Sequence, residues 1–199
     1  MNPKEIDALM LMGRSERIKN KPFVKIRGKE LFRYGYEALS EIFAKVFIVC
    51  EKSLGNKLKD YPDLDVVTES YGIGPLGGIY GGAKHSRAEF IFVTGCDMPF
   101  LNKRVMEFLC TLVEKDGVVI TNEKGFLEPL HSIYRREKAL EVLGGILGKE
   151  RRISKMIEQM DVRYVSTEKL RGYDEELITL RNINTRGDIA WLEGFLVRQ

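Results

Sequence analysis

Short apolar runs alternate with longer amphipathic segments along almost the whole chain of 199 residues. The runs are too short for buried helices, and we expect β-strands at Ile6–Met12, Val46–Cys50, Leu64–Thr68, Phe90–Thr94, Val118–Thr121, Leu130–Tyr134 and Val162–Ser166. Apolar residues at helical spacing predict helices at Leu31–Phe43, Pro75–Ser86, Lys103–Glu114, Arg136–Leu147, Ile153–Met160 and Asp188–Val197, with a further turn or two around Leu54, Leu58 and Tyr61. This alternation predicts an α/β fold: a doubly wound, mostly parallel sheet flanked by helices in three layers.

Length and charge narrow the class of protein. A chain of 199 residues without a linker or an internal repeat fits a single domain. Its 32 lysines and arginines nearly balance 29 aspartates and glutamates, which leaves a net charge of +3. Proteins dedicated to nucleic acids usually carry a clear basic excess, so we do not expect a nucleic-acid partner.

Cysteine usage and hydropathy indicate the compartment. Cys50, Cys96 and Cys110 are odd in number and widely spaced, which fits neither a disulfide framework nor a CxxC metal site. No apolar run approaches the roughly 20 residues of a transmembrane helix, and the N-terminal residues lack the pattern of a signal peptide. We therefore expect a reduced, cytoplasmic protein without a membrane partner.

Segment 14–29 is the outlier in composition. It holds one acidic residue, Glu16, and seven basic ones: Arg14, Arg17, Lys19, Lys21, Lys25, Arg27 and Lys29. It directly follows the first predicted strand, and open α/β sheets bind ligands beyond the carboxyl ends of their strands. A phosphate-binding loop is one interpretation, and a solvated run of charges is the other.

Residues Gly72–Gly77 match GxGxxG, and Asp97 follows 20 residues after Gly77. The pattern is typical of dinucleotide sites, although three residues separate its first glycine from the preceding strand. Alternatively, Pro75 begins a helix on which Gly74, Gly78 and Gly82 share one face, in contact with a neighbouring strand or a ligand. Both interpretations remain open at this point.

A carboxylate stands just beyond the most apolar strand. Asp97 follows the run 90–95, and Pro99 prevents a helix from starting there. A carboxylate at that edge suits Mg²⁺, which binds one or two carboxylates together with substrate phosphates. The alternative is a helix cap, but Asn102 is better placed to cap the helix at Lys103. Glu69 ends another strand, where it is either a second ligand-facing carboxylate or a surface residue.

The remaining polar candidates are weaker. His85 and His131 lack Cys or acidic neighbours at metal-ligand spacing, and no local base identifies Cys96 as a nucleophile. Asn182 and Asn184 would point to one face of an extended segment and offer two amides to a ligand. Turn and cap chemistry is the alternative there, because Thr185 and Asp188 can form a capping box.

Several segments, in order along the chain, are similar to motifs of one family. The opening motif LAGGxSxRMGxxK is similar to residues 8–21, although one glycine of the pair and the glycine after the methionine are absent. Further similarity covers Pro22–Ile26, Gly28–Lys29, Gly74–Gly78 (GPLAG), Cys96–Pro99 (CDxP), Glu128–His131 and Asn182–Thr185 (NxNT). Together these segments resemble the molybdenum cofactor guanylyltransferases, the molybdopterin-guanine dinucleotide biosynthesis protein A family.

The resemblance implies a fold and a reaction. The fold would be the Rossmann-like one of nucleotide-diphospho-sugar-type nucleotidyltransferases, with residues 1–100 as the nucleotide-binding half and residues 101–199 as the acceptor-binding half of one domain. The reaction would be Mg²⁺-dependent transfer of GMP from GTP to the terminal phosphate of molybdopterin, with release of pyrophosphate. Transient contacts with other proteins of cofactor biosynthesis are implied as well.

The family's functional positions fall on particular residues of this chain. Leu11, Met12 and Gly13 would meet guanine and ribose through backbone groups, and Met12 would bring a side chain to a place where the base approaches closely. The other residues implied are Lys21 and Asp97 for catalysis, Asp97 for Mg²⁺, Arg17, Lys21, Glu69 and Asp97 for the nucleotide, and Asn182 and Asn184 for the acceptor. A relative that uses CTP or another acceptor, a non-catalytic nucleotide-binding protein and a nicotinamide oxidoreductase remain alternatives.

Overall fold

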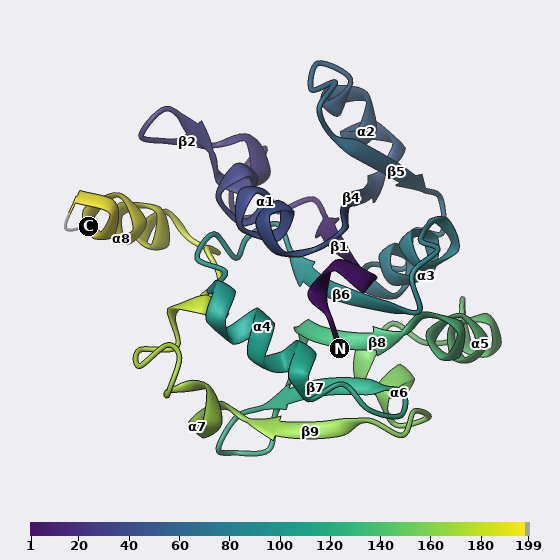
Figure 1. Cartoon of the computed structure of the whole chain (residues 1–199). Helices are drawn as coiled ribbons and strands as arrows, with labels where there is room; N and C mark the ends of the chain where they lie inside the picture. Colours follow the sequence, from purple (N-terminus) through teal and green to yellow (C-terminus); the bar gives the residue numbers. More distant parts are fainter. Residues whose placement is uncertain (198–199) are drawn as a thin grey trace.

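The computed structural model describes residues 1–197, whose strands form one seven-stranded sheet and a small hairpin (Figure 1). The sheet order is β5-β4-β1-β6-β8-β7-β9. Its strands are β1 (Ile6–Met12), β4 (Lys45–Glu51), β5 (Asp65–Glu69), β6 (Phe90–Gly95), β7 (Gly117–Thr121), β8 (Leu127–Arg135) and β9 (Arg163–Ser166). β8 runs antiparallel to both β6 and β7, and the other pairs are parallel. The prediction of a mostly parallel sheet is therefore confirmed.

Helices cover both faces of this sheet (Figure 1). The helices are α1 (Leu31–Ile42), α2 (Lys52–Leu58), α3 (Pro75–His85), α4 (Lys103–Thr111), α5 (Arg136–Ile146), α6 (Ile153–Ile157), α7 (Thr167–Leu170) and α8 (Arg186–Val197). Apolar residues of α1, α2 and α4 pack on one face, and those of α3, α5 and α6 pack on the other. Every residue of β1 is buried because the strand lies between both helical layers.

The structure differs from the sequence prediction in its shortest elements. A hairpin of β2 (Lys25–Ile26) and β3 (Lys29–Glu30) occupies the end of the basic segment. Strands of two residues show no periodicity, and the hairpin depends on its turn, where Arg27 and Gly28 have φ of 52° and 86°. α4 and α6 also end three residues earlier than we expected, and α7 was not predicted.

The glycines of α3 let its backbone approach the sheet. A Cβ at Gly78 would lie 3.1 Å from a methyl carbon of Leu11, and one at Gly82 would lie 2.7 Å from Leu9 and 2.9 Å from Val49. The interpretation of close packing on a strand holds for these two glycines. Gly74 stands before the helix with φ of +66°, and a Cβ there would meet no atom within 4 Å.

Substituting Gly82 by alanine is expected to lower the free energy of unfolding by about 1–3 kcal/mol, because the added methyl group overpacks a rigid contact. Urea unfolding followed by circular dichroism measures the change. Gly144→Ala on α5 is the matched control, since nothing lies within 4 Å of that position and alanine favours a helix. An equal loss in both variants would contradict the packing role of Gly82.

His131 on β8 is a buried histidine without a polar partner. Its ring meets the ring of Phe92 edge to face at 5.2 Å, and no group in residues 1–197 hydrogen-bonds to either ring nitrogen. The side chain is fully buried, and burial lowers its pKa to about 3.

Because histidine in an unfolded chain titrates near pH 6.5, protonation favours unfolding below that pH. Between pH 6.5 and 4.5, His131 is expected to cost roughly 2.3 kcal/mol of stability, because the slope approaches about 1.4 kcal/mol per pH unit only below pH 6.5. Urea unfolding across this range measures the slope. The loss should disappear in His131→Leu and persist in the control His85→Leu, whose histidine is exposed. A slope unchanged by His131→Leu would place the acid sensitivity elsewhere.

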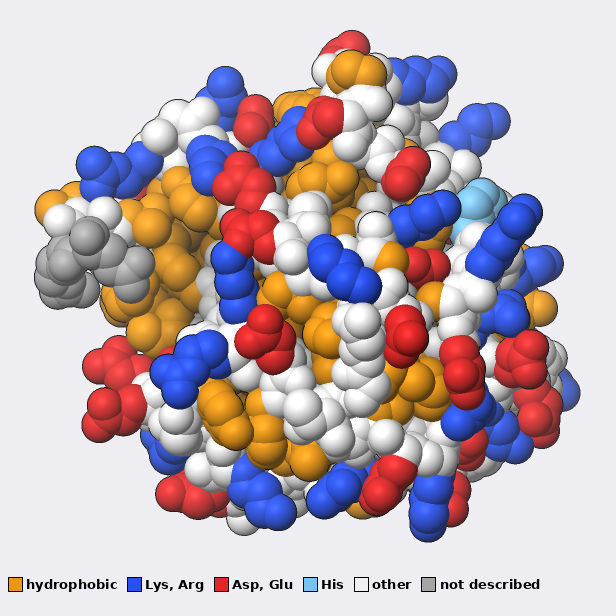
Figure 2. Space-filling model, viewed as in Figure 1, with side chains coloured by type: hydrophobic (Ala, Val, Ile, Leu, Met, Phe, Trp, Pro, Cys, Tyr) orange, Lys and Arg blue, Asp and Glu red, His pale blue; other side chains and the backbone are white. Residues whose placement is uncertain are grey.

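Helix α8 packs at one side of the molecule, against the hairpin and the start of α1 (Figure 1). Ile26, Leu31, Ile183 and Leu192 form a small separate core there. Apolar side chains gather on the surface beside α8 (Figure 2). No helix within residues 1–197 is long and apolar enough to cross a membrane.

Candidate functional site

Three residues far apart in the sequence meet at the carboxyl end of the sheet. The ammonium Nζ of Lys21 lies 2.6 Å from Asp97 Oδ2 and 3.2 Å from Asn184 Oδ1. The side chain of Lys21 is 8% exposed and that of Asp97 is 22% exposed, so the pair is largely shielded from water. A shielded ion pair attracts more strongly than a surface one, because the local dielectric constant is lower.

Asp97 is positioned by backbone contacts after β6. The carbonyl oxygen of Asp97 accepts a hydrogen bond of 2.9 Å from the amide of Ile183, and the amide of Cys96 donates to the carbonyl of Leu11 at 3.0 Å. A Cβ at Gly95 would lie 2.5 Å from Asp97 Oδ1, so the carboxylate can fold back only over a glycine. Gly95 is thus a positioning residue, and no local pattern in the sequence indicates this role.

Lys21 enters the site through a tight turn of the basic segment. Asn20 has φ of 56°, and Lys21 begins a short 3₁₀ helix, Lys21–Phe23. Other cations of the segment are more exposed and form ion pairs: Arg14 with Glu51, Lys25 with Glu30 and Lys29 with Glu37. The segment is therefore not one uniform loop, and only Lys21 of its cations is buried.

A central cavity of about 420 Å³ opens beside this pair, at the ends of β1, β4 and β6. Its wall includes six of the residues predicted from sequence: Leu11, Met12, Gly13, Lys21, Glu69 and Asp97. Met12 is only 2% exposed, because its side chain packs in the core beneath α1 and α4. The expectation that this side chain would obstruct the approach of a base is therefore wrong.

A second, cationic cavity of about 330 Å³ shares Gly13, Arg14 and Lys21 with the central cavity. Its charged lining residues are Arg14, Lys19, Lys21 and Lys57, and the lining contains no Asp or Glu. Lys57 reaches it from α2, where its Nζ donates to Asn20 Oδ1 at 2.6 Å. No sequence signal separated Lys57 from other surface lysines, because only the tertiary fold brings α2 beside the turn.

Glu69 lines the central cavity and also hydrogen-bonds to the loop at the edge of this cavity. Its Oε2 accepts a hydrogen bond of 2.7 Å from the backbone amide of Tyr71, at the start of the glycine-rich loop. Gly72 and Gly74 of this loop have positive φ and line the same cavity. The predicted glycine-rich segment thus forms one wall of the site.

Asn182 and Asn184 separate in the structure. Asn184 contacts Lys21, whereas Asn182 is exposed and its side-chain amide donates to the carbonyl of Leu180 at 3.4 Å. The predicted capping box is confirmed: Thr185 Oγ1 accepts from the amide of Asp188, and Asp188 Oδ2 accepts from the amides of Asn184 and Thr185. These hydrogen bonds lower the pKa of Asp188 and fix the backbone of Asn184.

Arg17, which the resemblance implied for the nucleotide, and Cys96, for which the sequence showed no local base, make no hydrogen bond with the Lys21 or Asn184 side chains. Arg17 is exposed and lines neither the central nor the cationic cavity. Cys96 is 5% exposed, and burial raises the pKa of its thiol to about 12. Burial therefore keeps the thiol protonated near neutral pH, which makes Cys96 a poor nucleophile.

The side chains at this site determine which kind of metal ion could bind there. Residues 1–197 contain no group of three or more His, Cys, Asp or Glu side chains that could enclose a metal. Asp97 nevertheless supplies one hard carboxylate at the mouth of a cationic cavity. That set fits Mg²⁺, which keeps waters and takes substrate phosphates as further ligands, and does not fit an all-protein metal cage.

A doubly wound sheet with a glycine-lined cavity at its carboxyl edge, extended by a cationic cavity, defines the class of nucleotide-binding α/β proteins. The MobA-like NTP transferase domain matches residues 9–164. The chain belongs to this family. The resemblance stated from the sequence motifs is thereby confirmed.

Individual relatives agree over nearly the full length. The probable molybdenum cofactor guanylyltransferase of Thermococcus kodakarensis is 32% identical over 94% of this chain and 93% of its own length. The corresponding protein of Bacillus subtilis is 30% identical over 96% and 95%. The crystal structure of molybdopterin-guanine dinucleotide biosynthesis protein A from Archaeoglobus fulgidus superposes with a TM-score of 0.85 at 27% identity, covering 98% of this chain and 100% of that one.

Proposed function

We propose that this protein is a Mg²⁺-dependent guanylyltransferase that transfers GMP from GTP to the terminal phosphate of molybdopterin and releases pyrophosphate. The observation that carries the proposal is the pair of Lys21 and Asp97 at the junction of a glycine-lined cavity and a cationic one. The names of the relatives support guanine as the base and molybdopterin as the acceptor.

The two cavities suit the two ends of a nucleoside triphosphate. Guanine and ribose would occupy the central cavity, against the backbone of Leu11, Met12 and Gly13. The β- and γ-phosphates would lie among the cations of the cationic cavity, because clustered Lys and Arg neutralise phosphate charge. The α-phosphate would then lie beside Lys21, where the cavities meet.

The reaction needs positioning and charge neutralisation more than a protein nucleophile. An oxygen of the acceptor's terminal phosphate forms a bond to the α-phosphorus of GTP, and the bond from that phosphorus to the bridging oxygen breaks. Pyrophosphate leaves with the electron pair. The ammonium of Lys21, held by Asn184 Oδ1, is placed to neutralise the charge that develops on the α-phosphate.

Asp97 would hold the metal ion. A bound Mg²⁺ supplies charge stabilisation to the phosphates and orients them. Asp97 also holds Lys21 through Oδ2, so this carboxylate would keep the ammonium and the metal at one place. Glu69 would contact the nucleotide, and Asn182 and Asn184 the acceptor, whereas Arg17 lines neither nucleotide cavity.

We assign nucleotide binding to the first half of the chain and acceptor binding to the second half. The cationic cavity is lined by residues 13–57, and Leu130 alone among the lining residues of the central cavity lies beyond residue 100. This distribution supports residues 1–100 as the nucleotide-binding half. A cytoplasmic location and transient contacts with other proteins of cofactor biosynthesis complete the proposal.

Calorimetric titration of the full chain with GTP, CTP, ATP and NAD, each with and without Mg²⁺, tests this function. We expect the tightest binding for GTP with Mg²⁺, and pyrophosphate release only when a molybdopterin acceptor is added. Preferred binding of CTP with Mg²⁺ would assign another base, and preferred binding of NAD without metal would contradict a nucleotidyltransferase. GTP binding without turnover would identify a non-catalytic relative.

A further inference from the structure

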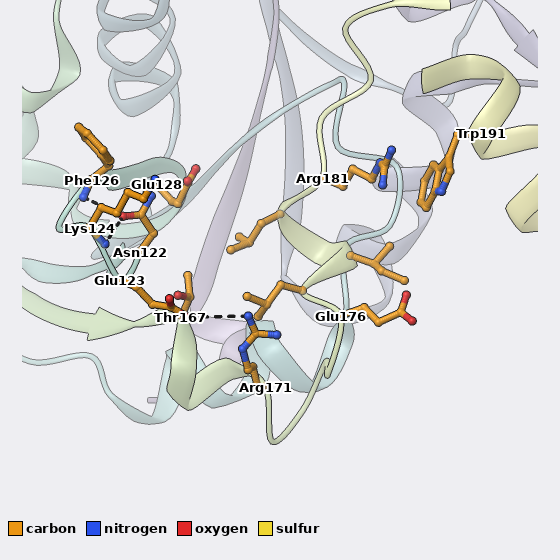
Figure 3. A pocket seen from close by; sticks show the side chains of 13 residues that line it. Asn122, Glu123, Lys124, Phe126, Glu128, Thr167, Arg171, Glu176, Arg181 and Trp191 are labelled. Carbon is orange, nitrogen blue, oxygen red and sulfur yellow. Dashed lines mark hydrogen bonds and ion pairs between the residues drawn. The ribbon is translucent and has the colours of Figure 1, made fainter. Parts of the chain in front are cut away.

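A third cavity, of about 700 Å³, lies between the start of β8 and the segment around Arg181, and we name it the β8 cavity (Figure 3). The turn between β7 and β8 supplies Phe126 to one wall, and the start of β8 supplies Glu128. The segment before α8 supplies Arg181 to the facing wall, and α8 itself supplies Trp191 (Figure 3). No residue of this cavity belongs to the nucleotide-binding set proposed above.

The β8 cavity adjoins the reaction site along both walls. Glu128 lines it, while Leu130, two residues further along the strand, lines the central cavity. Arg181 lines it, while Asn184, three residues on, contacts Lys21. Two or three extended residues span at most roughly 7–11 Å. A molecule in the β8 cavity can therefore extend one end to Lys21.

Arg181 presents a flat cationic surface. Its guanidinium carbon lies 3.5 Å from the centroid of the Trp191 ring, and the ring of Phe195 stacks on Trp191 at 5.2 Å. This stack holds the guanidinium plane in place, and 41% of the side chain remains exposed. A fixed guanidinium plane of this kind is a good surface for stacking a planar heterocycle.

Glu128 offers an acceptor without a partner. It is half-buried, and no group in residues 1–197 donates a hydrogen bond to its carboxylate. Burial raises the pKa of Glu128 and no neighbouring charge counters that effect. A half-buried carboxylate without a donor is stabilised most by a ligand with two parallel N–H groups, because each of its two oxygens can then accept a hydrogen bond.

We propose that the β8 cavity binds the ring of the acceptor substrate, with Arg181 stacking on a planar heterocycle and Glu128 accepting hydrogen bonds from a 2-amino-4-oxopyrimidine edge. The phosphate of the same molecule points to Lys21. This inference rests on the proposed function, since it identifies the acceptor's ring by the chemistry of the wall. Glu128 and Arg181 are then specificity residues for the acceptor, outside the nucleotide site.

Fluorescence titration with neopterin monophosphate, a stable pterin phosphate, tests the proposal. The comparison ligand is the lumazine phosphate of the same side chain, in which an oxygen replaces the 2-amino group. We expect the wild-type protein to bind the pterin at least tenfold more tightly than the lumazine. Glu128→Gln should remove most of that preference, whereas Arg181→Met should weaken both ligands at least tenfold.

Glu176→Gln is the matched control, because Glu176 lines the same cavity and is exposed. It should leave both affinities unchanged. GTP binding, measured in parallel, should be unchanged in all three variants, and thermal unfolding should show that each is folded. If GTP binds but Glu128→Gln keeps the preference for pterin, or if the wild type binds neither pteridine, the inference is wrong and the proposed function stands. If the wild type does not bind GTP, the proposed function itself fails.

Discussion

Replacing Asp97 with asparagine is expected to slow pyrophosphate release at saturating GTP and Mg²⁺ by at least roughly a thousandfold. The change removes the charge that would hold the metal and that holds Lys21 Nζ at 2.6 Å. Asparagine has nearly the same size, so the turn after β6 and its backbone contacts with Leu11 and Ile183 should survive. A pyrophosphate assay on the purified variant measures the loss.

Asp161→Asn provides the matched control for this experiment. Asp161 is an exposed carboxylate that pairs with Lys115 at 2.9 Å, outside all three cavities. Its substitution should leave turnover within about twofold of the wild type, since exposed ion pairs contribute little. Circular dichroism should show native folding in both variants. Turnover by Asp97→Asn at the wild-type rate would remove Asp97 from the mechanism.

Replacing Lys21 with alanine is expected to weaken GTP binding by about 100-fold while guanosine binding changes by less than about threefold. The ammonium is buried where the central and cationic cavities meet, and charge-assisted hydrogen bonds to phosphate are among the stronger polar contacts in proteins. Guanosine carries no phosphate and cannot use this contact. Calorimetric titration of both ligands measures the difference.

Lys25→Ala separates a local effect of Lys21 from the charge of the whole basic segment. Lys25 belongs to the same segment but is exposed, pairs with Glu30 at 3.9 Å and lines neither the central nor the cationic cavity. It should weaken GTP binding by less than about twofold at physiological salt. Equal losses of GTP and guanosine binding in Lys21→Ala would contradict a phosphate role for Lys21.

The Lys21→Ala and Asp97→Asn variants each leave one charged group of the ion pair without its partner. Lys21→Ala leaves the Asp97 carboxylate without its cation, and Asp97→Asn leaves the ammonium without its anion. An unpaired, largely shielded charge lowers stability, so both variants are expected to unfold at lower temperature than the wild type. Measuring binding and turnover well below the unfolding transition keeps these effects apart from catalysis.

Much of the architecture follows from local patterns in the sequence. The strand at Ile6–Met12 was predicted with the bounds that the structure shows, because a run of seven residues in which only Asp7 is polar is typical of a buried strand. The position of Asp97 at the ligand edge followed from the run before it and from Pro99 after it. These signals lie within about ten residues, so they are visible without knowledge of the fold.

The sequence by itself therefore determined the class of fold, the family motifs and the edge of the sheet at which the site lies. The tertiary structure decided which side chains meet there: Lys21 with Asn184, Lys57 with the turn at Asn20, and Glu128 opposite Arg181 across the β8 cavity. It also decided that Met12 points into the core. Side-chain direction and contacts between distant segments depend on how whole layers pack, which no local pattern records.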